Sequence, residues 1–123
     1  MWHKDIGEKL IDWSTERGID KLESKRNDYI GNVVEELAEW QEGWNIDSEH
    51  EKIDALADIV VFSMTEMIKL GYHPDLVLLE VHREIASRTG AYSEEHGKWK
   101  KFTDEEAVSK WYKADFTDCK IKE

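Results

Sequence analysis

The sequence predicts an all-α protein, and three observations support this class. Apolar residues recur at helical spacing in four long segments, glycine or proline interrupts the chain between these segments, and no stretch alternates with a period of two as a strand does. The 123 residues fit one domain, and one Pro and seven Gly are too few for a loop-rich chain. We therefore expect a single domain over residues 1–123, in which residues 88–123 form a C-terminal arm or lid.

Each expected helix is bounded by a glycine, a proline or a capping residue. Gly18, Gly43 and Gly71 end the first three helices, and Pro74 suits the first turn of the fourth. A capping box beginning at Thr103 marks a short fifth helix. The expected ranges, in chain order, are 5–17, 28–42, 48–70, 74–90 and 103–111. Four main helices with a C-terminal extension indicate a four-helix bundle.

The third expected helix carries apolar residues on nearly every side of its second half. Residues 59–64 read Ile-Val-Val-Phe-Ser-Met, and a helix that is apolar all round is buried on all sides. Four helices of one chain can hardly enclose it. We therefore expect a second copy to complete the core, in a homodimer or a homotetramer; the alternative is a central helix in a monomeric bundle.

Charge and composition exclude several classes of partner. The net charge of −11 argues against binding a nucleic-acid polymer or an anionic membrane surface. A nucleotide stays compatible with this charge, because carboxylates hold phosphates through Mg²⁺. No apolar run is long enough to span a membrane, and the first residues lack the apolar stretch of a signal peptide. We expect a cytoplasmic protein, and the single Cys119 excludes an internal disulfide.

Two acidic stripes border the apolar faces of the second and third expected helices. Glu36 and Glu39 lie one turn apart on the second helix, and Glu51, Asp54 and Asp58 follow one side of the third. A solvated helix face explains either stripe alone. Packed antiparallel, however, the two helices bring these carboxylates together, and a hard divalent cation with oxygen ligands then offsets their repulsion. The pattern predicts a Mg²⁺ site, with Mn²⁺ as a substitute.

The same residues resemble a known family. The pattern Glu35-Glu36-x-x-Glu39, followed by Asp54-Ala-Leu-Ala-Asp58, is similar to the signature of the MazG-like all-α nucleoside triphosphate pyrophosphohydrolases, a superfamily that includes dimeric dUTPases and phosphoribosyl-ATP pyrophosphatase. The resemblance extends through residues 69–75 and 80–84. In residues 87–90, 97–99 and 110–115 the chain resembles small phage-type members, which implies the host cytoplasm as its location.

The resemblance implies Mg²⁺-dependent cleavage of a (d)NTP between its α and β phosphates, giving a (d)NMP and pyrophosphate. Glu36, Glu39 and Asp58 then match metal ligands of the family. The family's second motif is Glu-x-x-Asp, and here Ala55 stands where its Glu is expected. Either Asp54, one turn before Asp58, or Glu51, one turn earlier, takes its place as a ligand.

Other residues are candidates for proton transfer and substrate binding. Glu35 or Glu39 is expected to accept the proton of the attacking water. Phosphates need cations, and the candidates are Arg83 and Arg88, together with Lys98 or Lys101 from the C-terminal segment. The base needs an aromatic or polar slot, for which we expect Trp13 and Asn32. The remaining expectation is that Trp2, Trp99 and Trp111 pack in the interior.

A second function from another class is compatible with the departure at Ala55. A helical protein that keeps the bundle but lacks catalysis would act by binding a protein partner. A tight Mg²⁺ or Mn²⁺ site distinguishes the enzyme from this alternative. The sequence leaves the preferred base and sugar open.

Overall fold

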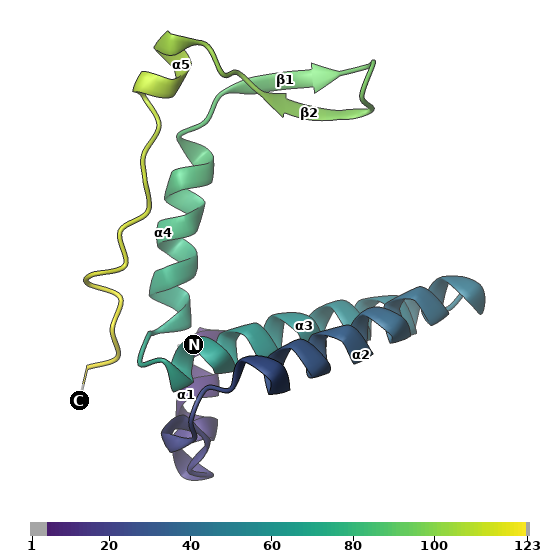
Figure 1. Ribbon diagram of the computed structural model, residues 1–123, viewed down its shortest axis with the longest axis vertical. Coiled ribbons are helices and arrows are strands. Elements are labelled where there is room, and N and C mark those ends of the chain that lie inside the picture. Colours follow the sequence, from purple (N-terminus) through teal and green to yellow (C-terminus); the bar gives the residue numbers. More distant parts are fainter. Residues whose placement is uncertain (1–4, 123) are drawn as a thin grey trace, which may run out of the picture. The chain divides into compact units, whose positions relative to one another are not determined.

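The computed structural model describes residues 5–122 of the chain and is predominantly helical (Figure 1). Its elements, in chain order, are α1 (Ile6–Glu16), a 3-10 turn η1 (Ile19–Lys21), α2 (Arg26–Asn45), α3 (Glu49–Lys69), α4 (Pro74–Ala86), β1 (Gly90–Ser93), β2 (Lys98–Lys101) and α5 (Glu105–Ser109). The expected helical class is confirmed. Trp2, one of the expected packing residues, lies outside the described residues.

The chain divides into two compact units, which we describe separately. The first contains the described residues up to Pro74 together with residues 121 and 122, and the second is Asp75–Lys120. α1, η1, α2 and α3 belong to the first unit. The second contains nearly all of α4, the β1–β2 hairpin and α5. None of the described helices is both long and apolar enough to cross a membrane.

The first unit is organised around the helical hairpin of α2 and α3, which lie side by side (Figure 1). Asp47 takes a left-handed conformation, with a φ of 52°, in the short turn between them. The Ser48 hydroxyl then caps α3 by accepting a hydrogen bond from the Glu51 amide at 3.2 Å. On α3, Ala55, Met64 and Ile68 are buried and form the core of this unit.

Gly43 lies inside α2 and does not end it, so the expected boundary at residue 42 is wrong. The helix continues to Asn45, and Gly43 is buried against the backbone of α3 at Glu51 and Lys52. A Cβ atom on Gly43 would lie 2.9 Å from the Lys52 backbone nitrogen. The glycine is therefore required by the contact between the two helices. A glycine that serves packing looks the same in sequence as one that ends a helix.

We predict that Gly43→Ala lowers the free energy of unfolding by about 1–2 kcal/mol. The new methyl group forces α2 away from the α3 backbone, and this overpacking outweighs the gain of up to about 1 kcal/mol in helix propensity. Gly31→Ala in the same helix is the matched control, because nothing lies within 4 Å of its Cβ position. The control should raise stability in urea denaturation at fixed protein concentration. Equal stabilisation by both substitutions would show that the helices do not touch at Gly43.

The second unit contains a β-hairpin, which contradicts the expectation that the chain has no strand. β1 and β2 pair antiparallel, with Gly90 opposite Lys101 and Tyr92 opposite Trp99. Gly97, with a φ of 63°, supplies the left-handed residue of the connecting turn. Trp99 is 52% exposed, so it does not pack in the interior as expected.

The fourth and fifth helices are shorter than the sequence predicts. α4 ends at Ala86 and not near Gly90, because the Ser87 hydroxyl donates to the Glu84 carbonyl and accepts the Tyr112 amide. α5 begins after Asp104, whose carboxylate caps the Ala107 amide at 3.3 Å. The expected cap at Thr103 is therefore wrong by one residue.

Candidate metal centre

Three carboxylates from α2 and α3 converge in the first unit. One oxygen from each of Glu36, Glu39 and Asp58 lies within 4.8 Å of the other two. Glu36 and Asp58 are half-buried and Glu39 is exposed. We call these three residues the carboxylate triad. They are the three residues that the family signature indicates most directly as metal ligands.

The local structure explains why these side chains meet. Glu36 and Glu39 are one turn apart on α2, so both project from the same side of this helix. The short turn at Asp47 brings α3 back alongside α2, and the close approach at Gly43 keeps the helices near each other. Asp58 on α3 therefore lies opposite the pair on α2.

The triad carries an uncompensated negative charge. A hydrogen bond with the Glu39 carboxyl is the largest cause that raises the pKa of Glu36 from 4.5 to about 7, followed by burial and by the charges of Glu39, Asp58 and Asp54. The Oε2 atom of Glu36 is buried and has no hydrogen-bond partner in the described part of the chain. Within residues 5–122, no lysine, arginine or histidine forms an ion pair with any member of the triad.

These properties fit a hard divalent cation. Mg²⁺ prefers carboxylate oxygens and keeps other positions for water or phosphate oxygens. A cation between the three oxygens would supply the positive charge that no side chain of the described residues supplies, and it would satisfy the buried oxygen of Glu36. An exposed acidic group often has no bound metal, so the orphaned and buried oxygen is the more informative observation.

The other acidic candidates lie outside the triad. Asp54 is exposed, but its charge contributes to the raised pKa of Glu36, which places it near the triad. Glu51 is exposed at the start of α3, and its backbone amide binds the Ser48 cap. Glu35 is exposed on α2. The electrostatic effect on Glu36 therefore favours Asp54 over Glu51 as the acid that accompanies the triad.

The expected base-binding residues are both accessible in the first unit. Trp13 on α1 is 39% exposed, and the Arg17 guanidinium lies 5.1 Å from its ring centroid. Asn32 is exposed on α2, one turn before Glu36. The structure does not bring Trp13 or Asn32 into the triad itself.

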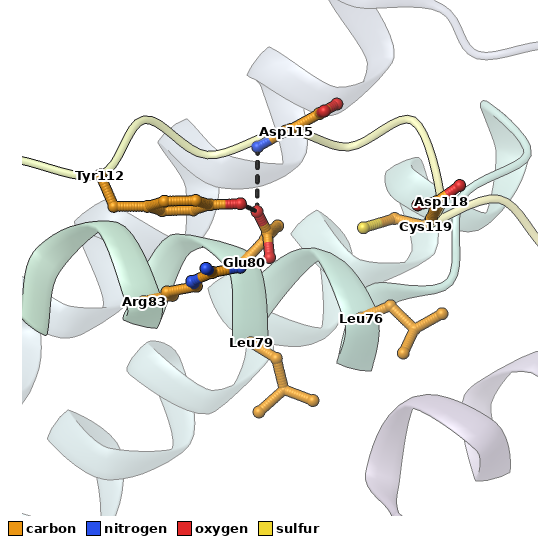
Figure 2. A pocket seen from close by; sticks show the side chains of 8 residues that line it. All are labelled: Leu76, Leu79, Glu80, Arg83, Tyr112, Asp115, Asp118 and Cys119. Atoms are coloured by element: carbon orange, nitrogen blue, oxygen red, sulfur yellow. Dashed lines mark hydrogen bonds between the residues drawn. The ribbon is translucent and has the colours of Figure 1, made fainter.

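The expected phosphate-binding cations Arg83, Arg88 and Lys98 all lie in the second unit. Lys98 is exposed on β2. The Arg88 guanidinium lies 3.9 Å from Glu84, and the Arg83 guanidinium stacks 3.8 Å from the ring centroid of Tyr112. Arg83 also borders a cavity of about 370 Å³, which lies between α4 and residues 112–119 of the C-terminal segment (Figure 2). Its other lining residues are Leu76, Leu79, Glu80, Tyr112, Asp115, Asp118 and Cys119.

Glu80 joins the two walls of this cavity. Its carboxylate accepts hydrogen bonds from the Tyr112 hydroxyl and from the Asp115 amide (Figure 2). These bonds lower the pKa of Glu80, and the bond to Glu80 raises the pKa of Tyr112. Burial raises the pKa of the Cys119 thiol at the same cavity, which disfavours its thiolate form. Sequence reasoning missed this network, although residues 110–115 had been singled out by the resemblance.

Comparison with known proteins gives no assignment: no protein-family model, no curated protein and no solved structure matches the chain. The resemblance to the MazG-like superfamily therefore stays a prediction from the motif residues. The case for a function depends on the carboxylate triad and its surroundings.

Proposed function

We propose that this chain is a Mg²⁺-dependent nucleotide pyrophosphohydrolase of the MazG-like type, which acts on the (d)NTP pool of the cytoplasm. The carboxylate triad is the observation that carries the proposal. It combines oxygen ligands within 4.8 Å, a buried oxygen without a partner and a pKa of about 7 at Glu36. A nucleoside triphosphate is the class of substrate whose phosphates share a metal ion with such a triad.

The residues of the first unit would divide the chemistry between them. Glu36, Glu39 and Asp58 would hold the ion, and Asp54 would add a nearby negative charge. Bound Mg²⁺ or Mn²⁺ neutralises phosphate charge and supplies Lewis acidity. Glu39 is the exposed member of the triad, and Glu35 is exposed four residues earlier, so either carboxylate is placed to accept a proton from water.

Substrate binding is proposed for the accessible residues that the sequence indicates. Trp13 offers an exposed indole for stacking against a base, and Asn32 offers a polar side chain one turn from Glu36. Arg83, Arg88 and Lys98 are the proposed phosphate-binding cations, and Arg88 and Lys98 have no hydrogen-bonded partner for their side chains among the described residues.

A second copy of the chain completes the proposed enzyme. The hairpin of α2 and α3 leaves large apolar side chains half exposed to solvent: Ile30, Val34, Leu37, Ile53, Leu56 and Val60. Exposed apolar side chains gathered on one helical hairpin are typical of an interface. We propose that a homodimer or a homotetramer buries it in a four-helix bundle. Sedimentation velocity tests this point, because a single 14.5 kDa species would exclude it.

Product analysis tests the proposed activity. Purified protein with Mg²⁺ is expected to convert a (d)NTP into the monophosphate and pyrophosphate, in a panel of all bases and both sugars. Orthophosphate as the product would contradict cleavage between the α and β phosphates. If no nucleotide is cleaved and no divalent ion binds, the alternative of a catalytically silent helical binding protein is favoured.

A further inference from the structure

Two cationic side chains lie against one indole ring in the second unit. The Arg88 guanidinium carbon is 5.5 Å from the ring centroid of Trp111, and the Lys101 ammonium nitrogen is 5.1 Å from the same centroid. Arg88 follows α4, Lys101 ends β2 and Trp111 follows α5. The fold of this unit therefore gathers three nitrogen-bearing groups from separate segments.

These groups lack hydrogen-bond acceptors. The Nε atom of Arg88 and the Nε1 atom of Trp111 are buried without a partner in the part of the chain that the structure describes. The nearest carboxylate oxygen, Oε2 of Glu84, is 3.9 Å from Arg88 Nη2, which is beyond hydrogen-bonding distance. Lys101 has neither an ion pair nor a hydrogen bond from its side chain within residues 5–122. Buried donors in proteins are normally satisfied, so this arrangement needs an acceptor.

The hairpin fixes Lys101 at this position. Lys101 pairs with Gly90, and the Phe102 amide donates to the Thr89 carbonyl at 2.8 Å, which extends the pairing towards Arg88. The Trp99 ring occupies the space that a side chain on Gly90 would need, since a Cβ atom there would lie 2.4 Å from the ring. Successive residues of a strand point to opposite faces, so Lys100 projects away from the face that carries Lys101.

We propose that Arg88, Lys101 and Trp111 form a binding site for a phosphoryl oxyanion. All three groups donate and none accepts, and the ion pair of Arg88 with Glu84 at 3.9 Å leaves the charge of Lys101 uncompensated within the described residues. A tetrahedral oxyanion offers more acceptor oxygens than a carboxylate, and it matches the fork of a guanidinium. The Arg88 side chain is 31% exposed, so a ligand enters from solvent.

The inference rests on the proposed function in one respect, because Arg88 is already a proposed phosphate-binding cation, and it adds the partners of Arg88. Free phosphate, diphosphate and the phosphates of a nucleotide share the required chemistry. The test uses full-length, metal-free protein with ¹⁵N-labelled tryptophan. Its indole signals are followed by NMR at constant ionic strength while phosphate, diphosphate or a nucleoside triphosphate is added. The signal missing in Trp111→Phe identifies Trp111. We expect this signal to shift and saturate, and we expect sulfate to compete.

Variants on the two faces of β2 provide the decisive comparison. Lys101→Gln removes one charged donor and is expected to weaken binding by about tenfold or more. Lys100→Gln removes the same charge from the opposite face and should leave the dissociation constant within about twofold. Arg88→Lys, which keeps the charge but loses the fork, should also weaken binding. Glu84→Gln removes the nearest carboxylate and should tighten it.

Two results would overturn the inference. One is the absence of a saturable Trp111 shift with every phosphoryl anion while the Tyr92–Trp99 cross-strand contacts persist. The other is an equal loss of affinity in Lys100→Gln and Lys101→Gln, which would show that the anion responds only to the overall charge. Tighter binding of diphosphate or nucleotide than of phosphate would support the site and identify its ligand as a diphosphate or nucleotide. Tighter binding of free phosphate would support the site and identify its ligand as free phosphate.

Discussion

Glu36→Gln and Asp58→Asn are each expected to reduce pyrophosphate release by about a thousandfold or more. Each substitution replaces a carboxylate of the triad with a neutral amide, so the negative charge that holds the divalent ion is lost. Lewis-acid stabilisation by a bound metal contributes several kcal/mol to the transition state, and about 4 kcal/mol corresponds to this factor. Steady-state assays of kcat/KM with a (d)NTP and Mg²⁺ measure the change.

Two controls separate loss of the metal site from loss of the fold. Glu42→Gln changes an exposed acid one turn after Glu39, outside the triad, and should leave kcat/KM within about twofold. Glu36→Gln should melt at least as high as the metal-free wild type at pH 7, because the neutral amide removes repulsion from Glu39 and Asp58. Wild-type activity in both triad variants would refute the metal centre. An equal loss of kcat/KM in Glu42→Gln would refute the location of the metal centre at the triad.

Added Mg²⁺ is expected to raise the free energy of unfolding, and a rise in pH without Mg²⁺ is expected to lower it. The pKa of Glu36 is raised from 4.5 to about 7 in the folded protein, so its contribution to stability is fully present below pH 4.5 and is lost as the pH rises through 7. Metal-free protein should therefore become less stable over this range. Mg²⁺ binds the ionised carboxylate and competes with this proton, so its stabilising effect should increase over the same range.

The size of the metal effect follows from mass action. At a Mg²⁺ concentration about 100 times the dissociation constant, binding adds about 2.7 kcal/mol, which raises the Tm of a chain of this length by roughly 10 °C. Thermal unfolding at pH 5 and pH 8, with and without Mg²⁺, measures both effects. Glu36→Gln should lose both dependences. A Mg²⁺ effect of the same size at both pH values would mean that the ion binds away from Glu36.

The carboxylate triad could be predicted from sequence because its geometry is local. The spacing of Glu36 and Glu39 fixes their common side on any α-helix, and the short connection to α3 forces the next helix to return alongside. Burial of the Glu36 oxygen and its raised pKa could not be predicted, because they depend on how closely α2 and α3 approach each other. Gly43 was misinterpreted for the same reason, because its role also depends on the approach of α3 to α2.

The β-hairpin was missed because its sequence lacks the usual pattern of a half-buried strand. β2 reads Lys-Trp-Lys-Lys and is exposed throughout, and β1 begins with a glycine. Pairing here depends on the glycine turn at Gly97 and on the fit of the Trp99 ring over Gly90, which are contacts across the turn. Trp111 was expected to pack in the interior, and only the structure shows that its indole N–H is buried without an acceptor.

The key contacts of the two units join residues at different separations in the sequence. The triad belongs to one continuous segment, residues 36–58, whereas Glu80 binds Tyr112 and Asp115 across separations of 32 and 35 residues. The entropy of loop closure increases with the number of residues enclosed, and local contacts form fastest. We therefore expect the metal ligands to assemble early in folding. On a ribosome, they would become available before most of residues 75–120 has been synthesised.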